Sequence, residues 1–259
     1  MKTKLQIIKI GGHVIDDASV LDQFLVDFAH LDSPKILVHG GGKIATKLSE
    51  QLGIKTKINE GRRITSKENL EVVTMVYAGL INTQITAQLQ AKGCNAIGLS
   101  GADANTILAE KRAVKPIDFG EVGDVKKINT SVIHSLLSTQ LSPVFCAISH
   151  DGNGNLLNTN ADTVAAELAI ALNNQYDTEL IYCFEKKGVL ANIDQDKSFI
   201  PQLTVADFDQ LKTAGLIYGG VLPKIENCFH ALRYKVQKVR IGGVGQLKKN
   251  TTVFTAFSL

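Results

Sequence analysis

The residues whose types and spacing suggest chemistry stand in five short stretches of the sequence. In two of them an apolar run ends in glycines: Lys9 precedes Gly11 and Gly12 in "IIKIGG", and residues 38–43 read "VHGGGK". Glycines at such a junction let the backbone approach a ligand closely, and a helix start offers free N–H groups to an anion. The spacing matches neither GxGxxG nor GxxxxGK, so the dinucleotide fingerprint and the usual P-loop do not fit. Taken singly, each stretch is also explained by a tight turn or by a lysine that extends to solvent.

A third stretch, "NLLNTNAD", places Asn158, Asn160 and Asp162 at alternating positions ahead of an alanine-rich helix. In an extended segment these three side chains share one side. A helix N-cap accounts for one of them. The remaining polar residues favour a binding site at the start of that helix.

The last two stretches carry cations. Lys224 follows two glycines in "YGGVLPK", near a predicted helix start, where a bound anion would offset both the helix dipole and the ammonium. Arg62 and Arg63 stand on one arm of a predicted hairpin, and an arginine can bind a carboxylate through two hydrogen bonds. Ordinary alternatives stay open for both stretches: a solvated lysine, and charges that protect an edge strand from aggregation.

Composition excludes several classes of function. The 259-residue chain has 28 Lys and Arg against 25 Asp and Glu, a net charge of +3 without a basic run, which argues against a nucleic-acid partner. The four cysteines are far apart, as free thiols in a reducing compartment are, and the six histidines lack metal-ligand spacing. Neither a signal peptide nor an apolar run of membrane length is found. We therefore expect a cytoplasmic protein with no membrane partner and no metal held by its own side chains.

Apolar runs and helical patterns alternate, which predicts an α/β fold with a parallel sheet and helices on its faces. We expect one continuous sheet in two lobes that divide near residue 173. Thr65, with Glu68 three residues on, fits a capping box at the start of a long helix. The predicted strands cover 4–10, 34–40, 95–101, 143–149, 179–184, 238–243 and 251–257, with hairpins at 55–65 and 107–129. The predicted helices cover 19–31, 43–53, 65–92, 161–172, 204–214 and 221–235.

Together and in this order, the five stretches resemble the amino acid kinase family, and the resemblance covers nearly the whole chain. "IIKIGG", "VHGGG", "GRRIT", "NTNAD" and "GGVLPK" carry it, and they are most similar to the members that phosphorylate N-acetyl-L-glutamate on the way to arginine. The resemblance implies a three-layer α/β/α sandwich with a mainly parallel central sheet and two lobes. The N-terminal lobe, about 1–172, would bind the acyl-glutamate and form a homodimer. The C-terminal lobe, about 173–259, would bind ATP, with Mg²⁺ held mainly by the nucleotide phosphates.

The resemblance also implies roles for individual residues. Lys9 and Lys224 would hold the transferring phosphoryl group, and Asp162 would keep both ammonium groups protonated and oriented. Because a γ-carboxylate has a pKa of about 4.3, the acceptor is already anionic at neutral pH and needs no general base. The implied substrate-binding residues are Gly41, Gly42, Arg63 and Asn158, and we add Arg62 and Asn160 as candidates because they stand beside these residues in the sequence. The implied nucleotide-binding residues are Gly11, Gly12, Glu185, Lys187, Gly188, Leu190, Leu216 and Tyr218.

Some positions depart from the family pattern. Phe184 and Glu185 stand where members usually have a small polar residue and Asp, and Asn250 stands where Gly is common. No helix precedes the first strand, and such a helix accompanies arginine-inhibited hexamers in the family, so we expect a dimer insensitive to arginine. Arg62 replaces a usual aliphatic residue, which raises N-succinyl-L-glutamate as an alternative substrate. A different class of function, a non-catalytic amino-acid or nucleotide sensor on this fold, is disfavoured by intact Lys9, Asp162 and Lys224.

Overall fold

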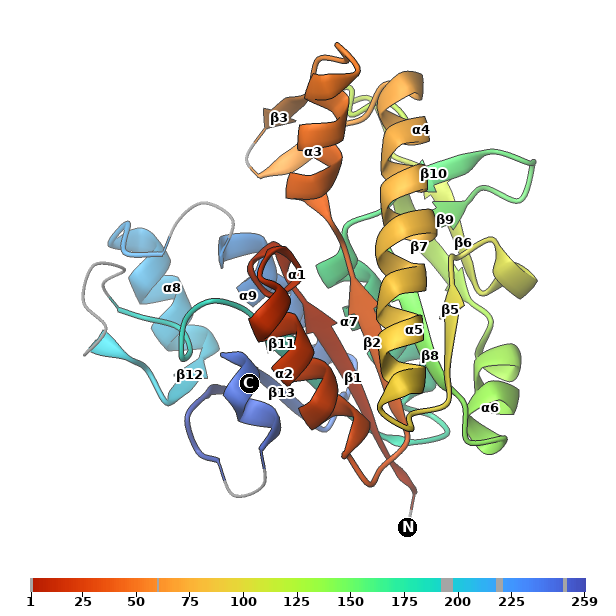
Figure 1. The fold of residues 1–259 in the computed structure, drawn as a ribbon. Coiled ribbons are helices and arrows are strands. Elements are labelled where there is room, and N and C mark those ends of the chain that lie inside the picture. Colours follow the sequence, from red (N-terminus) through yellow and green to blue (C-terminus); the bar gives the residue numbers. More distant parts are fainter. Residues whose placement is uncertain (1, 60, 192–197, 218–220, 249–250) are drawn as a thin grey trace.

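The computed structural model describes residues 2–59, 61–191, 198–217, 221–248 and 251–259 (Figure 1). Within these residues the central sheet has eight strands, and all neighbouring pairs are parallel except β13 and β14. In spatial order the strands are β12 (Gln202–Thr204), β14 (Thr255–Ser258), β13 (Lys238–Gly242), β11 (Asp177–Cys183), β1 (Lys4–Ile10), β2 (Lys35–His39), β8 (Ser142–Cys146) and β5 (Ala96–Leu99). The prediction of a mainly parallel sheet is confirmed.

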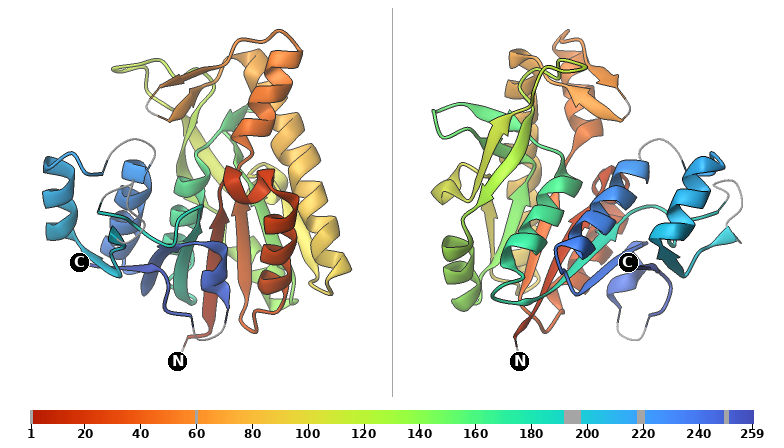
Figure 2. Two further views of the ribbon diagram at one scale, coloured as in Figure 1. Left: turned by 60° about the vertical axis from the view of Figure 1, so that its left-hand side comes forward. Right: turned by 180° about the vertical axis from the view of Figure 1, so that it is seen from behind.

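Helices cover both faces of this sheet, so the molecule has the predicted three layers (Figures 1 and 2). One face packs on α1 (Gly12–Asp16), α2 (Ala18–Ala29) and the long helix made of α4 (Lys67–Thr74), η1 (Met75–Ile81) and α5 (Asn82–Ala91). The other face packs on α6 (Thr130–Ser138), α7 (Ala161–Leu172), α8 (Val205–Thr213) and α9 (Val221–Arg233). The remaining long helix is α3 (Gly42–Gln51).

Side chains of β1 alternate between these two layers. Ile8 and Ile10 belong to the core on the α2 side, whereas Leu5 and Ile7 belong to the core on the α7 side. Because a strand has a period of two, Lys9 falls on the same face as Leu5 and Ile7. The alternation thus directs its ammonium towards α7.

A separate four-stranded sheet corrects the expectation of one continuous sheet. Its order is β10 (Leu156–Asn158), β9 (Ile148–His150), β6 (Ile107–Lys111) and β7 (Gly123–Ile128). The predicted strand 143–149 is split between β8 and β9, because the backbone changes partners at Ala147: its carbonyl accepts from Thr159 N at 3.0 Å. The predicted hairpin at 55–65 is confirmed as β3 (Lys57–Asn59) and β4 (Arg62–Ile64).

The long helix runs over the predicted span, but its cap is Ser66 and not Thr65. The Ser66 hydroxyl accepts from Asn69 N at 3.2 Å and lies 2.7 Å from a Glu68 carboxylate oxygen. Thr65 is fully buried, and its backbone instead pairs with the loop before β7. The middle of this helix, Met75–Ile81, is π-helical.

Smaller differences concern the number and the bounds of the elements. Helices α1 and α6 and the short strands β10 and β12 were not predicted, and β14 begins only at Thr255.

Among the described residues, no helix combines the length and the apolar character needed to cross a membrane. The four cysteines are buried and unpaired, as predicted.

Candidate active site

Two lysines from opposite ends of the chain meet one carboxylate. Lys9 Nζ lies 2.7 Å from Asp162 Oδ1, and Lys224 Nζ lies 2.6 Å from Asp162 Oδ2. All three side chains are at least 87% buried, with exposed fractions of 10%, 11% and 13% for Lys9, Lys224 and Asp162. The sequence-based prediction that Lys9 faces Asp162 is confirmed.

Regular structure places each member of this cluster. Lys9 comes from the face of β1 that packs on α7, and Asp162 lies in the first turn of α7. Lys224 lies in the first turns of α9, which packs beside α7, and its ammonium lies 5.3 Å from the centroid of the Tyr182 ring. The Tyr182 hydroxyl donates to the Asp162 carbonyl oxygen at 2.8 Å, which ties α7 to β11.

Charge and burial oppose each other in this cluster. Burial alone would raise the pKa of Asp162, but the ammonium groups of Lys224 and Lys9 hold that pKa well below its usual range. Burial lowers the pKa of Lys9, Asp162 partly offsets the decrease, and Lys224 adds to it. Asp162 therefore acts on Lys9 in the predicted direction, but burial outweighs it.

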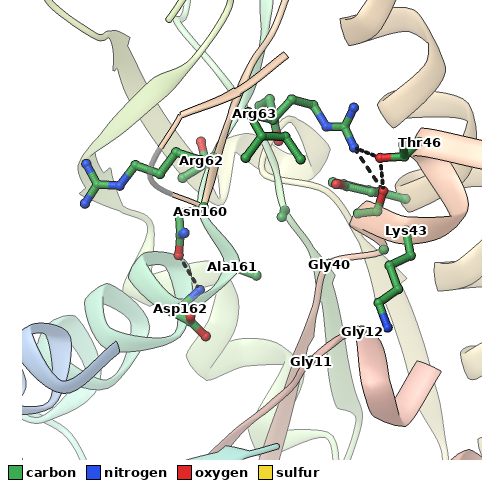
Figure 3. Close-up of a pocket in the computed structure, with 18 of the residues that line it drawn as sticks. Gly11, Gly12, Gly40, Lys43, Thr46, Arg62, Arg63, Asn160, Ala161 and Asp162 are labelled. Atoms are coloured by element: carbon green, nitrogen blue, oxygen red, sulfur yellow. Dashed lines mark hydrogen bonds between the residues drawn. The ribbon is translucent and has the colours of Figure 1, made fainter. Parts of the chain in front are cut away.

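Asn160 is the one residue of the Asn158, Asn160 and Asp162 set that serves as the expected helix N-cap. Its side-chain oxygen accepts from Asp162 N at 2.8 Å and from Thr163 N at 3.1 Å, so Asn160 is the N-cap of α7 (Figure 3). This cap fixes the first turn of the helix that carries Asp162. Asn160 still lines the cavity described below.

The glycine turn after β2 is held by a buried histidine. His39 Nδ1 lies 2.8 Å from the Gly40 carbonyl oxygen, and His39 Nε2 lies 3.0 Å from Asn82 Nδ2. Since the amide of Asn82 donates to Nε2, the proton of a neutral imidazole sits on Nδ1 and donates to Gly40. Burial lowers the pKa of His39 to about 4, so the ring is neutral at physiological pH. The neutral His39 ring therefore holds the glycine turn through its hydrogen bond to Gly40.

Gly41 occupies a position that no side chain fits. A Cβ there would clash with Cδ1 of Ile81 and lie 3.0 Å from Cδ1 of Tyr77, both on the π-helical segment. Gly42 follows as the first residue of α3. The turn therefore packs tightly against the long helix on one side and offers bare backbone on the other.

Arg63 reaches from β4 to the start of α3. Its guanidinium donates to the Gly42 carbonyl at 2.9 Å and to the Thr46 hydroxyl at 2.6 Å (Figure 3). It also donates to the Thr56 hydroxyl at 3.1 Å. Asn158, on β10, donates its amide to the Thr65 hydroxyl at 3.0 Å. These contacts hold both polar groups in fixed places at the wall of the cavity.

These groups surround a cavity of about 880 Å³. Its walls are formed by the ends of β1 and β2, the start of α3, the β3–β4 hairpin and the segment before α7. Its lining includes Lys9, Gly11, Gly12, Gly41, Gly42, Arg62, Arg63, Asn158, Asn160, Asp162 and Glu185 from the predicted set. The structure therefore brings together every predicted substrate-binding residue.

The predicted nucleotide-binding residues are less closely gathered. Glu185 lines the cavity and Lys187 is exposed, whereas Gly188 and Leu190 are buried. A Cβ at Gly188 would clash with the Phe199 ring, which explains this glycine by packing. Leu216 is 43% exposed, and Tyr218 lies outside the described residues.

Comparison with known proteins identifies the chain's relatives. The model of the family described as "Amino acid kinase family" matches residues 4–243. The chain belongs to the amino acid kinase family. It is 50% identical over 250 residues to the acetylglutamate kinase of Bacteroides thetaiotaomicron, covering 96% of this chain and 97% of that one. It is 52% identical to the acetylglutamate kinase of Phocaeicola vulgatus, over 93% of this chain and 94% of that one.

Solved structures share the fold of this chain. smu.665 from Streptococcus mutans superposes with a TM-score of 0.79 at 26% identity, covering 97% of this chain and 98% of that one. N-acetylglutamate synthase from Neisseria gonorrhoeae gives a TM-score of 0.84 at 19% identity, covering 99% of this chain and 59% of that one. At that identity the second likeness concerns the fold alone.

Several residues of this amino acid kinase escaped the sequence analysis. They are His39, Thr46, Tyr77, Asn82, Arg112 and Tyr182. The position of Thr46, one helical turn after Gly42, was a usable signal, because side chains four apart share a helix face. Arg112 gave no such signal, since it reaches the cavity through the second sheet.

Proposed function

We propose that this chain transfers the γ-phosphoryl group of ATP to the side-chain carboxylate of N-acetyl-L-glutamate, giving an acyl phosphate. The observation that carries the proposal is the pair of buried ammonium groups on one carboxylate, at the edge of a cavity walled by glycine turns and arginines. Relatives at 50% and 52% identity over nearly the whole chain are named acetylglutamate kinase, which supports the same activity here.

Phosphoryl transfer to a carboxylate requires cations near the phosphate and no general base. The acceptor carboxylate is ionised at neutral pH, so the barrier lies in bringing it to a polyanionic phosphate in line with the leaving group. Lys9 and Lys224 would neutralise the charge that develops on the phosphoryl oxygens. Asp162 would hold both ammonium groups in place until the phosphates arrive. Tyr182 and the Asn160 cap support this arrangement by fixing Asp162.

The acceptor would lie between the glycine turn and the hairpin. Arg63 would bind its α-carboxylate and Asn158 its amide, while the backbone of Gly41 and Gly42 would approach the reacting carboxylate. Arg63 is already oriented by Gly42 and Thr46, so little side-chain entropy would be lost on binding.

The nucleotide would enter from the C-terminal part of the sheet, with its phosphates near Gly11 and Gly12 and its remainder near Glu185, Lys187 and Leu216. Among the described residues no group of three or more His, Cys, Asp or Glu side chains is placed to hold a metal ion. Asp162 is fully engaged by two lysines. We propose that Mg²⁺ enters with ATP, held by its phosphates.

We place the enzyme in the cytoplasm, in arginine biosynthesis, and propose that it is a homodimer. The long helix supports the last point, because it exposes the apolar side chains of Met75 and Leu80, at 53% and 46%. The division into an acceptor lobe, about 1–172, and a nucleotide lobe, about 173–259, belongs to the same proposal.

The test is a trapping assay. The purified chain is incubated with Mg-ATP, N-acetyl-L-glutamate and hydroxylamine, and hydroxamate and ADP are measured. We expect both products in equal amounts, and neither from the Asp162→Asn variant at a comparable rate. A wild-type protein that binds ATP but forms no hydroxamate would overturn the proposal in favour of a sensor.

A further inference from the structure

We propose that Lys43 is a further catalytic residue: its ammonium exchanges Asp16 for the γ-phosphoryl group when Mg-ATP occupies the cavity. The inference rests on the proposed function and adds a cation to it. Of the two lysines already assigned, Lys9 lines the cavity, whereas Lys224 lies behind it on Asp162. Because the phosphoryl group in transfer spreads its charge over three oxygens, a second cation in the cavity wall would stabilise it further.

Lys43 ends the glycine-rich stretch "VHGGGK" and lies in the first turn of α3. It lines the cavity together with the glycines before it, and its side chain extends towards Gly12 on the facing turn (Figure 3). Asp16 marks this approach, because its Oδ2 atom lies 3.4 Å from Lys43 Nζ and 3.4 Å from the place of a Cβ on Gly12. The ammonium therefore lies beside the turn of Gly11 and Gly12, where the phosphates are proposed to bind.

Lys9 borders the same turn from another direction. A Cβ on Gly11 would lie 3.9 Å from Lys9 Nζ. Lys9 reaches this point from the face of β1 that packs on α7, whereas Lys43 comes from α3 and meets the end of α1 through Asp16. The two cations therefore flank the turn and would contact one phosphoryl group from two sides, with the acceptor carboxylate on the side of Gly41.

The ion pair between Lys43 and Asp16 is weak enough to be exchanged. Its N–O distance is 3.4 Å and the lysine side chain is 77% exposed, whereas Lys9 lies 2.7 Å from Asp162 and is 10% exposed. Water screens an exposed pair of this kind, so it contributes little to stability. A phosphate carries more charge than one carboxylate and accepts several charge-assisted hydrogen bonds, so it competes favourably with Asp16 for the ammonium.

The local structure of α3 agrees with an anion at this place. The N-cap is Gly41, which has no side chain to bind the first N–H groups, and residues 42–45 include no acidic side chain. An ammonium in the first turn of a helix opposes the helix dipole. By contrast, α7 begins with the Asn160 cap and carries Asp162 in its first turn. A phosphoryl group beside Lys43 would offset both the dipole and the ammonium.

The exchange leaves the chemistry of the transfer unchanged. An oxygen of the acceptor carboxylate forms a bond to the γ-phosphorus while the bond from this phosphorus to the β–γ bridging oxygen breaks, and ADP leaves with that electron pair. No proton moves, and Lys43 stays an ammonium throughout. Because its contact with the phosphoryl oxygens strengthens as charge develops on them, its loss should reduce kcat and leave the binding of the acyl-glutamate unchanged.

The first test is steady-state kinetics with Mg-ATP and N-acetyl-L-glutamate. Lys43→Met should lower kcat roughly 10–100-fold, the value of a charge-assisted hydrogen bond, and should leave KM for the acyl-glutamate within about twofold of wild type. Lys43→Arg should keep most of the rate. Lys126→Met is the matched control, because Lys126 is also exposed and lies 3.2 Å from a carboxylate, that of Glu110, but does not line the cavity. A kcat within about twofold of wild type in Lys43→Met would overturn the inference.

A binding measurement tests the exchange without requiring turnover. If Asp16 competes with the phosphates for Lys43, Asp16→Asn should tighten the binding of AMP-PNP with Mg²⁺ roughly 3–10-fold in isothermal titration calorimetry. In the Lys43→Met background the same substitution should have a clearly smaller effect, because the competing contact is already lost. Equal effects in the two backgrounds would show that Asp16 acts on the phosphates directly and would overturn the exchange.

Failure of this inference and failure of the proposed function give different results. A wild-type protein that forms no hydroxamate in the trapping assay would overturn the proposed function. An active wild type with an equally active Lys43→Met variant would overturn only the role of Lys43. An equal loss of kcat in Lys43→Met and Lys43→Arg would assign the effect to packing at the start of α3 and would also overturn that role.

Discussion

Lys9 and Lys224 approach different oxygens of the same carboxylate, at 2.7 and 2.6 Å. Neither lysine therefore competes with the other for the same carboxylate oxygen; Lys9 and Asp162 line the cavity, and Lys224 lies behind them on Asp162. Replacing either lysine by Met should lower kcat roughly 10²–10³-fold, because each removes a cation that stabilises transition-state charge. Steady-state kinetics at saturating substrates measure this, with Lys126→Met as a surface control. A kcat within a few-fold of wild type in either variant would contradict the assigned roles.

The charges around Lys9 predict opposite pKa changes in two variants. Asp162→Asn removes the charge that raises the pKa of Lys9, so that pKa should fall. Lys224→Met removes a charge that lowers it, so the pKa should rise. Competitive acetylation of Lys9 across a pH range, read by mass spectrometry of its peptide, measures both without requiring activity. Shifts of the same sign in the two variants would show that burial alone controls Lys9.

The contact between Gly41 and Ile81 predicts a rescue. Gly41→Ala should raise KM for the acyl-glutamate and lower stability, since its Cβ would displace the turn from the long helix. Ile81→Val removes the Cδ1 methyl that clashes first, so the double variant should recover part of the loss. Gly79→Ala is the control, because a Cβ there meets nothing within 4 Å and alanine favours a helix. Independent, additive effects of the two substitutions would argue against the steric explanation.

Asn160 is expected to act mainly through stability. Loss of the cap in Asn160→Ala should cost about 1 kcal/mol in the free energy of unfolding, and Asn160→Ser should cost less. Urea unfolding measures both. If Asn160→Ser restores stability but not KM for the acyl-glutamate, the side chain also contacts substrate, as the sequence alone suggested.

The buried His39 predicts a pH-dependent contribution to stability. Its folded-state pKa of about 4 lies below the ordinary value of 6.5, so the unfolded chain takes up the proton first on acidification. The stabilisation is complete above pH 6.5 and is lost as pH falls towards 4, by up to roughly 3 kcal/mol. His39→Gln should lack this slope when urea unfolding is followed between pH 7 and 4. Parallel slopes for both proteins would show that other groups titrate there.

The parts of the site that the sequence could predict are those that follow from periodicity and local order. Alternation along β1 determines the face on which Lys9 lies, and Asp162 lies at the start of α7. The contact between these two residues could therefore be predicted from the sequence. The His39–Asn82 contact joins residues 43 positions apart and depends on where the long helix crosses β2. The helix is capped by Ser66, one residue from the expected place, because the backbone of Thr65 pairs with the loop before β7.

The sequence analysis did not predict the separate four-stranded sheet, because its formation also depends on contacts between distant parts of the chain. The apolar run 143–149 reads as one strand, because nothing in it marks the point at Ala147 where the backbone changes partners. Arg112 lies in the hairpin predicted at 107–129, which is confirmed as β6 and β7, but its place beside the cavity depends on how that hairpin pairs with β9 and with Asn158. Arg62 was recognised as unusual from the sequence, but its separation from Arg63 required the hairpin register.

Because the segment Met75–Ile81 is π-helical, the packing of the long helix is sensitive to a change of one residue in its length. Both side chains that press against Gly41, those of Tyr77 and Ile81, belong to it. An α-helix turns by about 100° per residue. Deleting one residue here would leave a continuous and more regular helix, yet it would rotate Ile85 and Leu89 out of the core. Natural length variation in this kinase should therefore collect in its loops and spare these seven residues.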